Sequence, residues 1–131
     1  MSNGTSSSVP STELLARFIF YHRHIRQSDL TVRPEAFMPH PQRELSVVRH
    51  DALDERAIWE IGRVVGAGQP NLLGRADVYG ATFESNGLDV VATPKLHIPL
   101  HADVTGWPKE KPAQKAIALK VVVAAGKVLE V

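Results

Sequence analysis

Hydrophobic and polar residues alternate from Leu14 to Tyr21, with the period of two that is typical of a β-strand. Ala16 and Phe18 fall on one side of this segment, while Arg17 and Ile19 fall on the other. Because apolar residues occur on both sides, we expect the strand to be well buried. Other segments with strand character are residues 30–33, 44–49, 75–84, 88–93 and 98–105.

Two of the connections between these segments carry strong turn signals. Asn86 and Gly87 separate two β-rich segments, and an Asn-Gly pair in that position predicts a β-hairpin. Three prolines prevent regular structure between residues 34 and 43. We therefore expect a hairpin over residues 75–93 and a long surface connection before residue 44.

The clearest helical pattern covers residues 54–65 and ends at Gly66, a typical residue for a helix end. Trp59 falls nearly opposite the apolar stripe of this helix, between Glu55 and Arg63. The indole is therefore expected either to anchor a partner at an interface or to be covered by a loop such as the proline-rich segment. The stripe expected to pack on the sheet consists of Ala57, Ile58, Ile61, Val64 and Val65.

A second helix is predicted from Pro112 to about Ala125, just before Gly126. The β-branched run at residues 121–123 leaves a strand as the alternative for its last part. Apolar side chains cover most of this helix, so its outer face also requires a cover. No other element of this short chain is free to supply one, which favours a homodimer.

The order of elements, three strands, a helix, three strands and a helix, predicts an α+β fold. We expect a mainly antiparallel sheet of about five or six strands with two helices packed on one face. Residues 1–12 are rich in Ser and Thr and are predicted to be a disordered tail. Residues 13–131 are predicted to form a single α+β domain.

Composition excludes several classes of function. The 131 residues carry a formal net charge of +1, which does not indicate nucleic acid or an acidic membrane as a partner. The absence of cysteine excludes disulfides, thiol nucleophiles and Cys-based metal sites, and fits a cytoplasmic location. The longest apolar run, residues 121–125, is too short to cross a membrane. We expect no membrane partner and no cofactor.

Histidines provide the first candidate site. His22 and His24 lie one residue apart after the first strand, and His101 and Asp103 have the same spacing on a later strand. A spacing of two puts each pair on one face of an extended chain. If the two strands are neighbours, the four side chains could act in acid–base catalysis or hold zinc or iron for hydrolysis. The alternative is that the histidines are ordinary surface or core residues.

Arginines provide the second candidate site. Arg17, Arg23, Arg26 and Arg33 are opposed only by Asp29, which gives residues 17–33 a local charge of +3. Guanidinium groups match the geometry of phosphate and carboxylate groups, so these arginines are candidates for binding a phosphate-containing ligand. A solvated basic surface is the alternative.

Residues 101–109 form a third candidate, because a strand there leads through Gly106 toward a helix start that could bind an anion. The glycine spacing of phosphate-binding loops is absent, and two prolines remove donors. We therefore favour a turn in which Trp107 packs into the core.

Two hypotheses of function follow. The first is a small soluble binding or accessory protein, a homodimer that acts through Trp59, the second helix and the arginine-rich segment, with a protein partner and a nucleotide or phosphate ligand. The alternative is an enzyme with a phosphate-containing or nucleotide substrate. In that enzyme His22, His24 or His101 would act as general acid or base, Asp103 would orient it, and Arg23 or Arg26 would stabilise charge. A His/Asp metal-dependent hydrolase is a variant of the second hypothesis.

Overall fold

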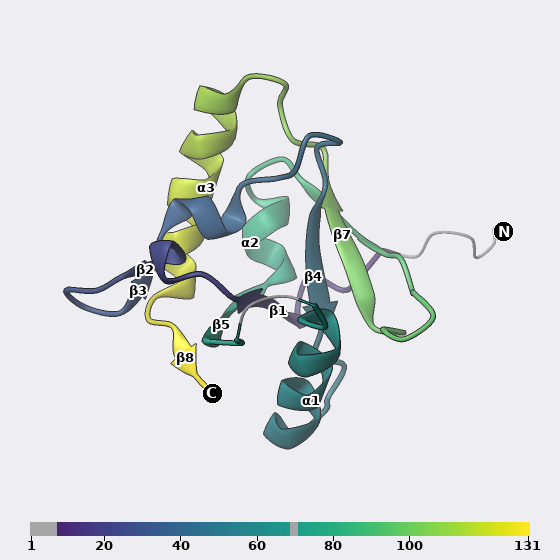
Figure 1. Ribbon diagram of the computed structural model, residues 1–131. Coiled ribbons are helices and arrows are strands. Elements are labelled where there is room, and N and C mark those ends of the chain that lie inside the picture. The colour runs from purple at the N-terminus through teal and green to yellow at the C-terminus, as the bar shows by residue number, and fades with distance from the viewer. Residues whose placement is uncertain (1–7, 69–70) are drawn as a thin grey trace, which may run out of the picture.

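The computed structural model describes residues 8–68 and 71–131 and shows an α+β fold built on a six-stranded antiparallel sheet (Figure 1). The strand order is β6-β7-β4-β1-β5-β8, which confirms the predicted fold class. The strands of this sheet are β1 (Leu14–Ile19), β4 (Leu45–Arg49), β5 (Gly74–Tyr79), β6 (Asp89–Ala92), β7 (His101–Thr105) and β8 (Leu129–Glu130). The helices are α1 (Glu55–Val65), α2 (Gly80–Glu84) and α3 (Lys111–Ala125), with 3-10 turns η1 (His22–His24) and η2 (Pro34–Phe37). A separate two-stranded ribbon pairs β2 (Ile25–Arg26) with β3 (Thr31–Val32).

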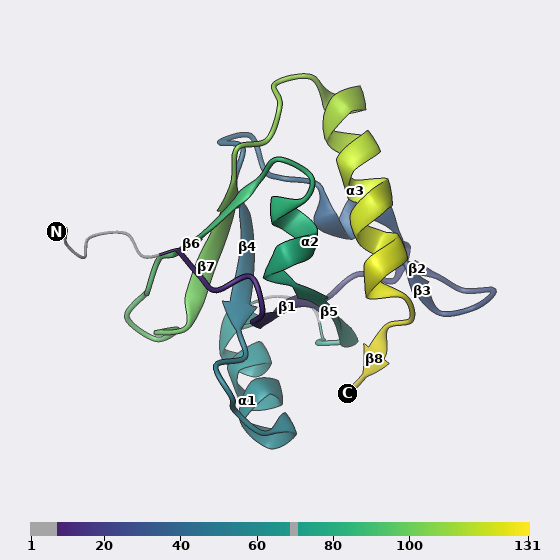
Figure 2. The same ribbon diagram turned by 180° about the vertical axis from the view of Figure 1, so that it is seen from behind.

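Both faces of the sheet are covered by other elements. Alternate residues of the central strand β1 point to opposite faces and pack into two different hydrophobic cores. Leu15 and Ile19 belong to the larger core, which contains α2, α3 and η2. Ala16 and Phe18 belong to a smaller core, which contains α1. The prediction that both long helices pack on one face is therefore wrong, and Figures 1 and 2 show α1 apart from α2 and α3.

Helix α1 begins and ends as predicted, and Ile58, Ile61 and Val65 of its predicted stripe pack in the smaller core. Asp54 accepts a 2.9 Å hydrogen bond from the Ala57 backbone N–H and caps the helix. Gly62 lies at the centre of the buried face, where an added Cβ would stand 2.6 Å from the Phe18 ring. This close approach rotates the helix so that Trp59 packs 6.4 Å from Phe18, while Val64 is exposed. The predicted outward position of Trp59 is therefore wrong.

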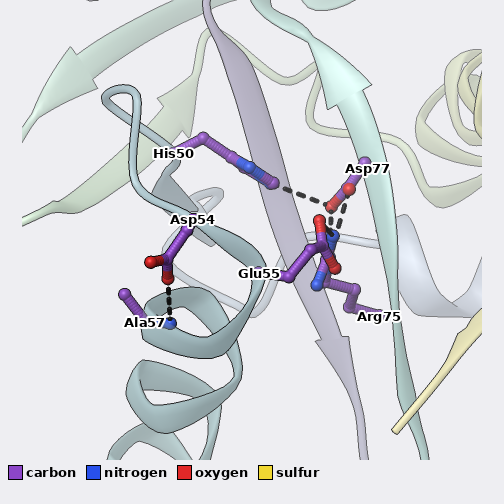
Figure 3. Close-up of polar contacts among 6 residues, drawn as sticks. All are labelled: His50, Asp54, Glu55, Ala57, Arg75 and Asp77. Atoms are coloured by element: carbon purple, nitrogen blue, oxygen red, sulfur yellow. Dashed lines mark hydrogen bonds and ion pairs between the residues drawn. The ribbon is translucent and has the colours of Figure 1, made fainter.

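A buried ionic cluster joins α1 to the sheet (Figure 3). The Arg75 side chain is 1% exposed and donates from Nε to both Asp77 oxygens and from Nη2 to Glu55 at 2.8 Å. His50 lies 3.1 Å from Asp77, and the Arg75 guanidinium lies 4.7 Å from the centre of the Trp59 ring. Burial disfavours the charged Asp77 carboxylate, but hydrogen bonds from His50 and Arg75 outweigh this effect and lower the pKa of Asp77.

The predicted hairpin over residues 75–93 is wrong. β5 pairs with β1, β6 pairs with β7, and the short helix α2 separates the two segments. Gly87, with a φ of +81°, ends this helix, and the Leu88 and Gly87 N–H groups donate to the carbonyls of Phe83 and Glu84. These two bonds form a Schellman motif, a common way for a helix to end at a glycine. The Asn-Gly pair suits this helix end as well as it suits a hairpin turn.

Other predictions concern the ends of the chain. Residues 1–7 of the predicted tail lie outside the described residues, whereas Val9 is buried in the larger core and its N–H donates to Val90. Packed structure therefore begins before residue 13. The second predicted helix is confirmed as α3, and Gly126 follows it with a φ of +67°.

The ionic cluster generates a test of stability. We expect Asp77→Asn to lower the free energy of unfolding by about 3 kcal/mol, because it weakens the pairing of a buried guanidinium. Urea unfolding measures this loss. Glu60→Gln is the matched control, since it neutralises a carboxylate in the exposed Arg56–Glu60 pair and should cost less than about 1 kcal/mol. Equal effects of the two substitutions would contradict the importance of the cluster.

Candidate functional site

The candidate site lies where the central strands β1 and β4 separate. β1 pairs with β5 along its whole length, from Leu14 to Ile19, but its pairing with β4 is confined to Leu15 and Ala16. Beyond that point the Arg17 side chain spans the opening and donates to the carbonyls of Ser46 at 2.9 Å and Ala36 at 2.8 Å. Arg17 therefore takes over part of the hydrogen bonding that a continuous ladder would supply.

A pocket of about 380 Å³ occupies this opening. Its polar lining comes from separate segments of the chain, namely β1, η1 with the residue before it, β4, the loop that precedes β7, and the first residue of β7. Among the residues that line it, none is acidic. The polar residues are Arg17, Tyr21, His24, Ser46, Lys95 and His101, and the apolar residues are Ala16, Phe18, Phe20, Val47, Val48, Val65 and Ile98.

Two permanent positive charges line the pocket. Burial lowers the pKa of Arg17 to about 10, so the guanidinium remains charged at neutral pH. Only two of its five N–H groups are needed for the bonds to Ser46 and Ala36, which leaves donors for a ligand. Lys95 supplies the second charge from an exposed position at the rim.

His101 lines the pocket from the first residue of β7 and is 5% exposed. Its Nδ1 lies 3.1 Å from the Thr93 carbonyl oxygen and 2.9 Å from the Thr93 hydroxyl. Burial lowers the pKa of His101, and the nearby Asp103 carboxylate opposes this shift. The ring is therefore neutral at neutral pH.

His24 lines the same pocket from η1, where its ring meets the edge of Tyr21 at 5.5 Å. Burial lowers the pKa of His24, and the positive charges of Arg23 and Arg17 lower it further. Glu35 acts in the opposite direction. His24 and His101 thus both add polar groups rather than permanent charge at neutral pH.

The four residues of the predicted histidine site do not all converge. His24 and His101 share the pocket, but His22 lines a different one, beside Ile25 and Leu30. Asp103 pairs with Ser46 across β7 and β4, outside the pocket lining. Within the described ranges, 8–68 and 71–131, no group of three or more His, Asp or Glu side chains is placed to hold a metal ion. These four residues therefore do not form the shared metal site that the hypothesis of a metal-dependent hydrolase assumed, and that hypothesis stays a prediction from the sequence.

The four arginines of the predicted phosphate site do not come together in the structure either. Only Arg17 lines the pocket, while Arg23 stacks over the Tyr21 ring at 4.4 Å. Arg26 lies 4.0 Å from Asp29 on the ribbon of β2 and β3. Arg33 is exposed, and its Nε approaches the Ile25 carbonyl at 3.5 Å. The local charge predicted from the sequence is therefore spread over a surface.

Three polar residues of the site carry no sequence signal. Ser46 stands far from His101 along the chain and meets it through the pairing of β4 with β7, whereas Thr93 and Lys95 lie in the connection between β6 and β7, eight and six residues before His101. The turn at residues 106–108 has the structure we favoured, since Trp107 is buried and its Nε1 donates to Val104 at 3.0 Å.

No protein-family model, curated protein or solved structure matches this chain. Its function is therefore inferred from the chemistry of the pocket. Over the residues that the structure describes, no helix is long and apolar enough to span a membrane.

The burial of His101 generates a pH prediction. We expect NMR titration of the imidazole to give a midpoint below the usual value of about 6.5, because burial disfavours the protonated ring. The folded ring then binds a proton less readily than the unfolded one, so the His101 contribution to stability falls as the pH drops below about 6.5. A midpoint at or above the usual value would contradict this description of the site.

Proposed function

We propose that this protein is a binding protein for a small molecule with an anionic group and an apolar body. The observation that carries the proposal is the meeting of Arg17, Lys95, His24 and His101 around one pocket with an apolar wall. A volume of about 380 Å³ falls within the range of small-molecule sites. The guanidinium and the ammonium attract the anionic group, and burial of the apolar body supplies further affinity.

The lack of acidic side chains in the pocket lining supports an anion over a cation. A carboxylate and the phosphate group expected from the sequence both fit the two positive charges. The apolar wall supports a ligand that is more than a free inorganic ion, because Phe18, Phe20 and Val65 offer it surface to bury.

Binding is favoured over the enzymatic alternative by the placement of the residues. That alternative assigned roles to Asp103, Arg23 and Arg26, and none of these residues lines the pocket. Of its candidate acids and bases, only His24 and His101 line the pocket, and the groups that would orient them or stabilise charge do not.

We further propose that the protein forms a homodimer through the outer face of α3. Leu119 and Val123, one turn apart on this helix, are 50% and 83% exposed. Two such faces can cover each other across a twofold axis. A cytoplasmic location and a separate protein partner remain predictions from the sequence.

A matched ligand pair tests the binding proposal. We expect benzoate and phenyl phosphate to bind the wild-type protein, and Lys95→Met to weaken both by about fivefold in isothermal titration calorimetry, because it removes one attractive charge. Lys109→Met, which removes a lysine outside the pocket, should leave both affinities unchanged. Equal effects of the two substitutions, or equally tight binding of neutral benzamide, would contradict an anion site here.

The dimer is tested separately by light scattering. The wild-type protein should have twice the 14.4 kDa mass of the chain, and Val123→Glu should reduce it to one chain by placing charge in the interface. Val64→Glu introduces the same change at an exposed valine of α1 and should leave the dimer intact. A wild-type protein of single-chain mass would refute the dimer.

A further inference from the structure

The contacts of His101 favour one tautomer of its ring. Nδ1 lies 2.9 Å from the Thr93 hydroxyl, which can donate or accept, and 3.1 Å from the Thr93 carbonyl oxygen, which can only accept, so a proton on Nδ1 satisfies both contacts. The neutral ring therefore has an unprotonated Nε2, which is an acceptor. No residue in the described ranges forms a hydrogen bond with Nε2, and the ring belongs to the pocket lining. A ligand in the pocket consequently meets an acceptor beside the positive charges of Arg17 and Lys95.

An ionised carboxylate does not suit that arrangement. It has only acceptor atoms at neutral pH, so its lone pairs would face the lone pair of Nε2. A sulfate ester has the same defect, because it carries no proton near neutral pH. A phosphate monoester loses its second proton with a pKa near 6, so its monoanion has a P–OH donor that can pair with Nε2. Its dianion, like a carboxylate or a sulfate ester, can bond to Nε2 only if the ring takes up a proton, and the two charges of the dianion favour that protonation more than a single charge does.

The charges around the pocket agree with a phosphate monoester. Arg17 and Lys95 together carry two positive charges, which a phosphate dianion balances and a single carboxylate does not. The groups around His101 act in both directions, since Asp103 and Glu44 favour its protonated form and Lys95 disfavours it. On the side of His24, Arg17 and Arg23 oppose protonation and Glu35 favours it. A doubly charged ligand would shift both rings toward the protonated form.

We infer that the ligand is a phosphate monoester of a small apolar alcohol, and that one proton is shared between a phosphate oxygen and Nε2 of His101. This inference rests on the proposed function of the pocket and specifies its ligand class. Thr93 is a positioning residue in this description, because it fixes the proton on Nδ1. The aromatic rings of Phe18 and Phe20 would contact the alcohol portion.

Calorimetry of the full chain at pH 6.0 with three aromatic probes tests the inference. Phenyl phosphate, phenyl sulfate and benzoate share a ring, but only the first carries a titratable proton near this pH. We expect phenyl phosphate to bind at least about tenfold more tightly than either of the others, as a hydrogen bond to a charged group predicts. At pH 8, titrations in two buffers of different ionisation enthalpy should show more proton uptake with phenyl phosphate than with phenyl sulfate.

The variant His101→Asn tests whether the preference for phenyl phosphate depends on the His101 ring. The amide of His101→Asn can still donate to the Thr93 carbonyl, but it lacks Nε2, so the preference for phenyl phosphate should fall to less than about threefold. The comparison of the three probes on the wild-type protein is decisive even if this variant does not fold. Equal binding of all three probes would overturn the inference and leave the anion site standing. Binding of none of them would overturn both proposals.

Discussion

The arrangement of the sheet face that α1 covers depends on the burial of the Arg75 guanidinium. A charge that is 1% exposed must be paired, and its three partners come from two elements: Asp77 on the same strand, and Glu55 and the Trp59 ring on successive turns of α1. These contacts set where α1 begins on the sheet. Gly62 then allows the helix to approach Phe18 closely. The far end of α1 supplies Val65 to the pocket, so the pocket wall depends indirectly on how one arginine is neutralised.

The pocket itself follows from an interruption of the sheet. A continuous ladder between β1 and β4 would leave no space in the centre of the molecule. Instead the strands separate after Ala16, and Arg17 satisfies two carbonyls that lie on either side of the opening. The same side chain thus stabilises the separation and supplies positive charge to the cavity that the separation creates. An apolar residue in its place would leave the carbonyls of Ser46 and Ala36 without these donors.

Local signals in the sequence predicted local structure well. The extent of α1, its end at Gly66 and the limits of α3 depend on neighbouring residues alone, and the structure confirms them. The Asn-Gly pair misled because the same two residues suit a hairpin turn and a helix end, and only the pairing of β5 with β1 decides between them. The predicted face of α1 was correct at Ile58, Ile61 and Val65. It was wrong at Trp59 and Val64, because an apolar stripe takes no account of Gly62 or of Glu55 bound to a buried arginine. For the site, the sequence named Arg17, His24 and His101, but their meeting depends on the strand order β7-β4-β1, which no local pattern encodes. Lys95 and Thr93 lie close to His101 in the connection between β6 and β7, where no motif marked them.

The hydrogen bond from Val9 to Val90 has a consequence for how copies of this chain can meet. Together with the bridge between Ser8 and Val91, it covers part of the outer edge of β6, the first strand of the sheet. At the other edge β8 is only two residues long. An open edge strand is a template on which a second sheet can grow, and short or covered edges are a common protection against such aggregation. Extension of the sheet from one molecule to the next is therefore disfavoured along the covered part of β6 and along β8.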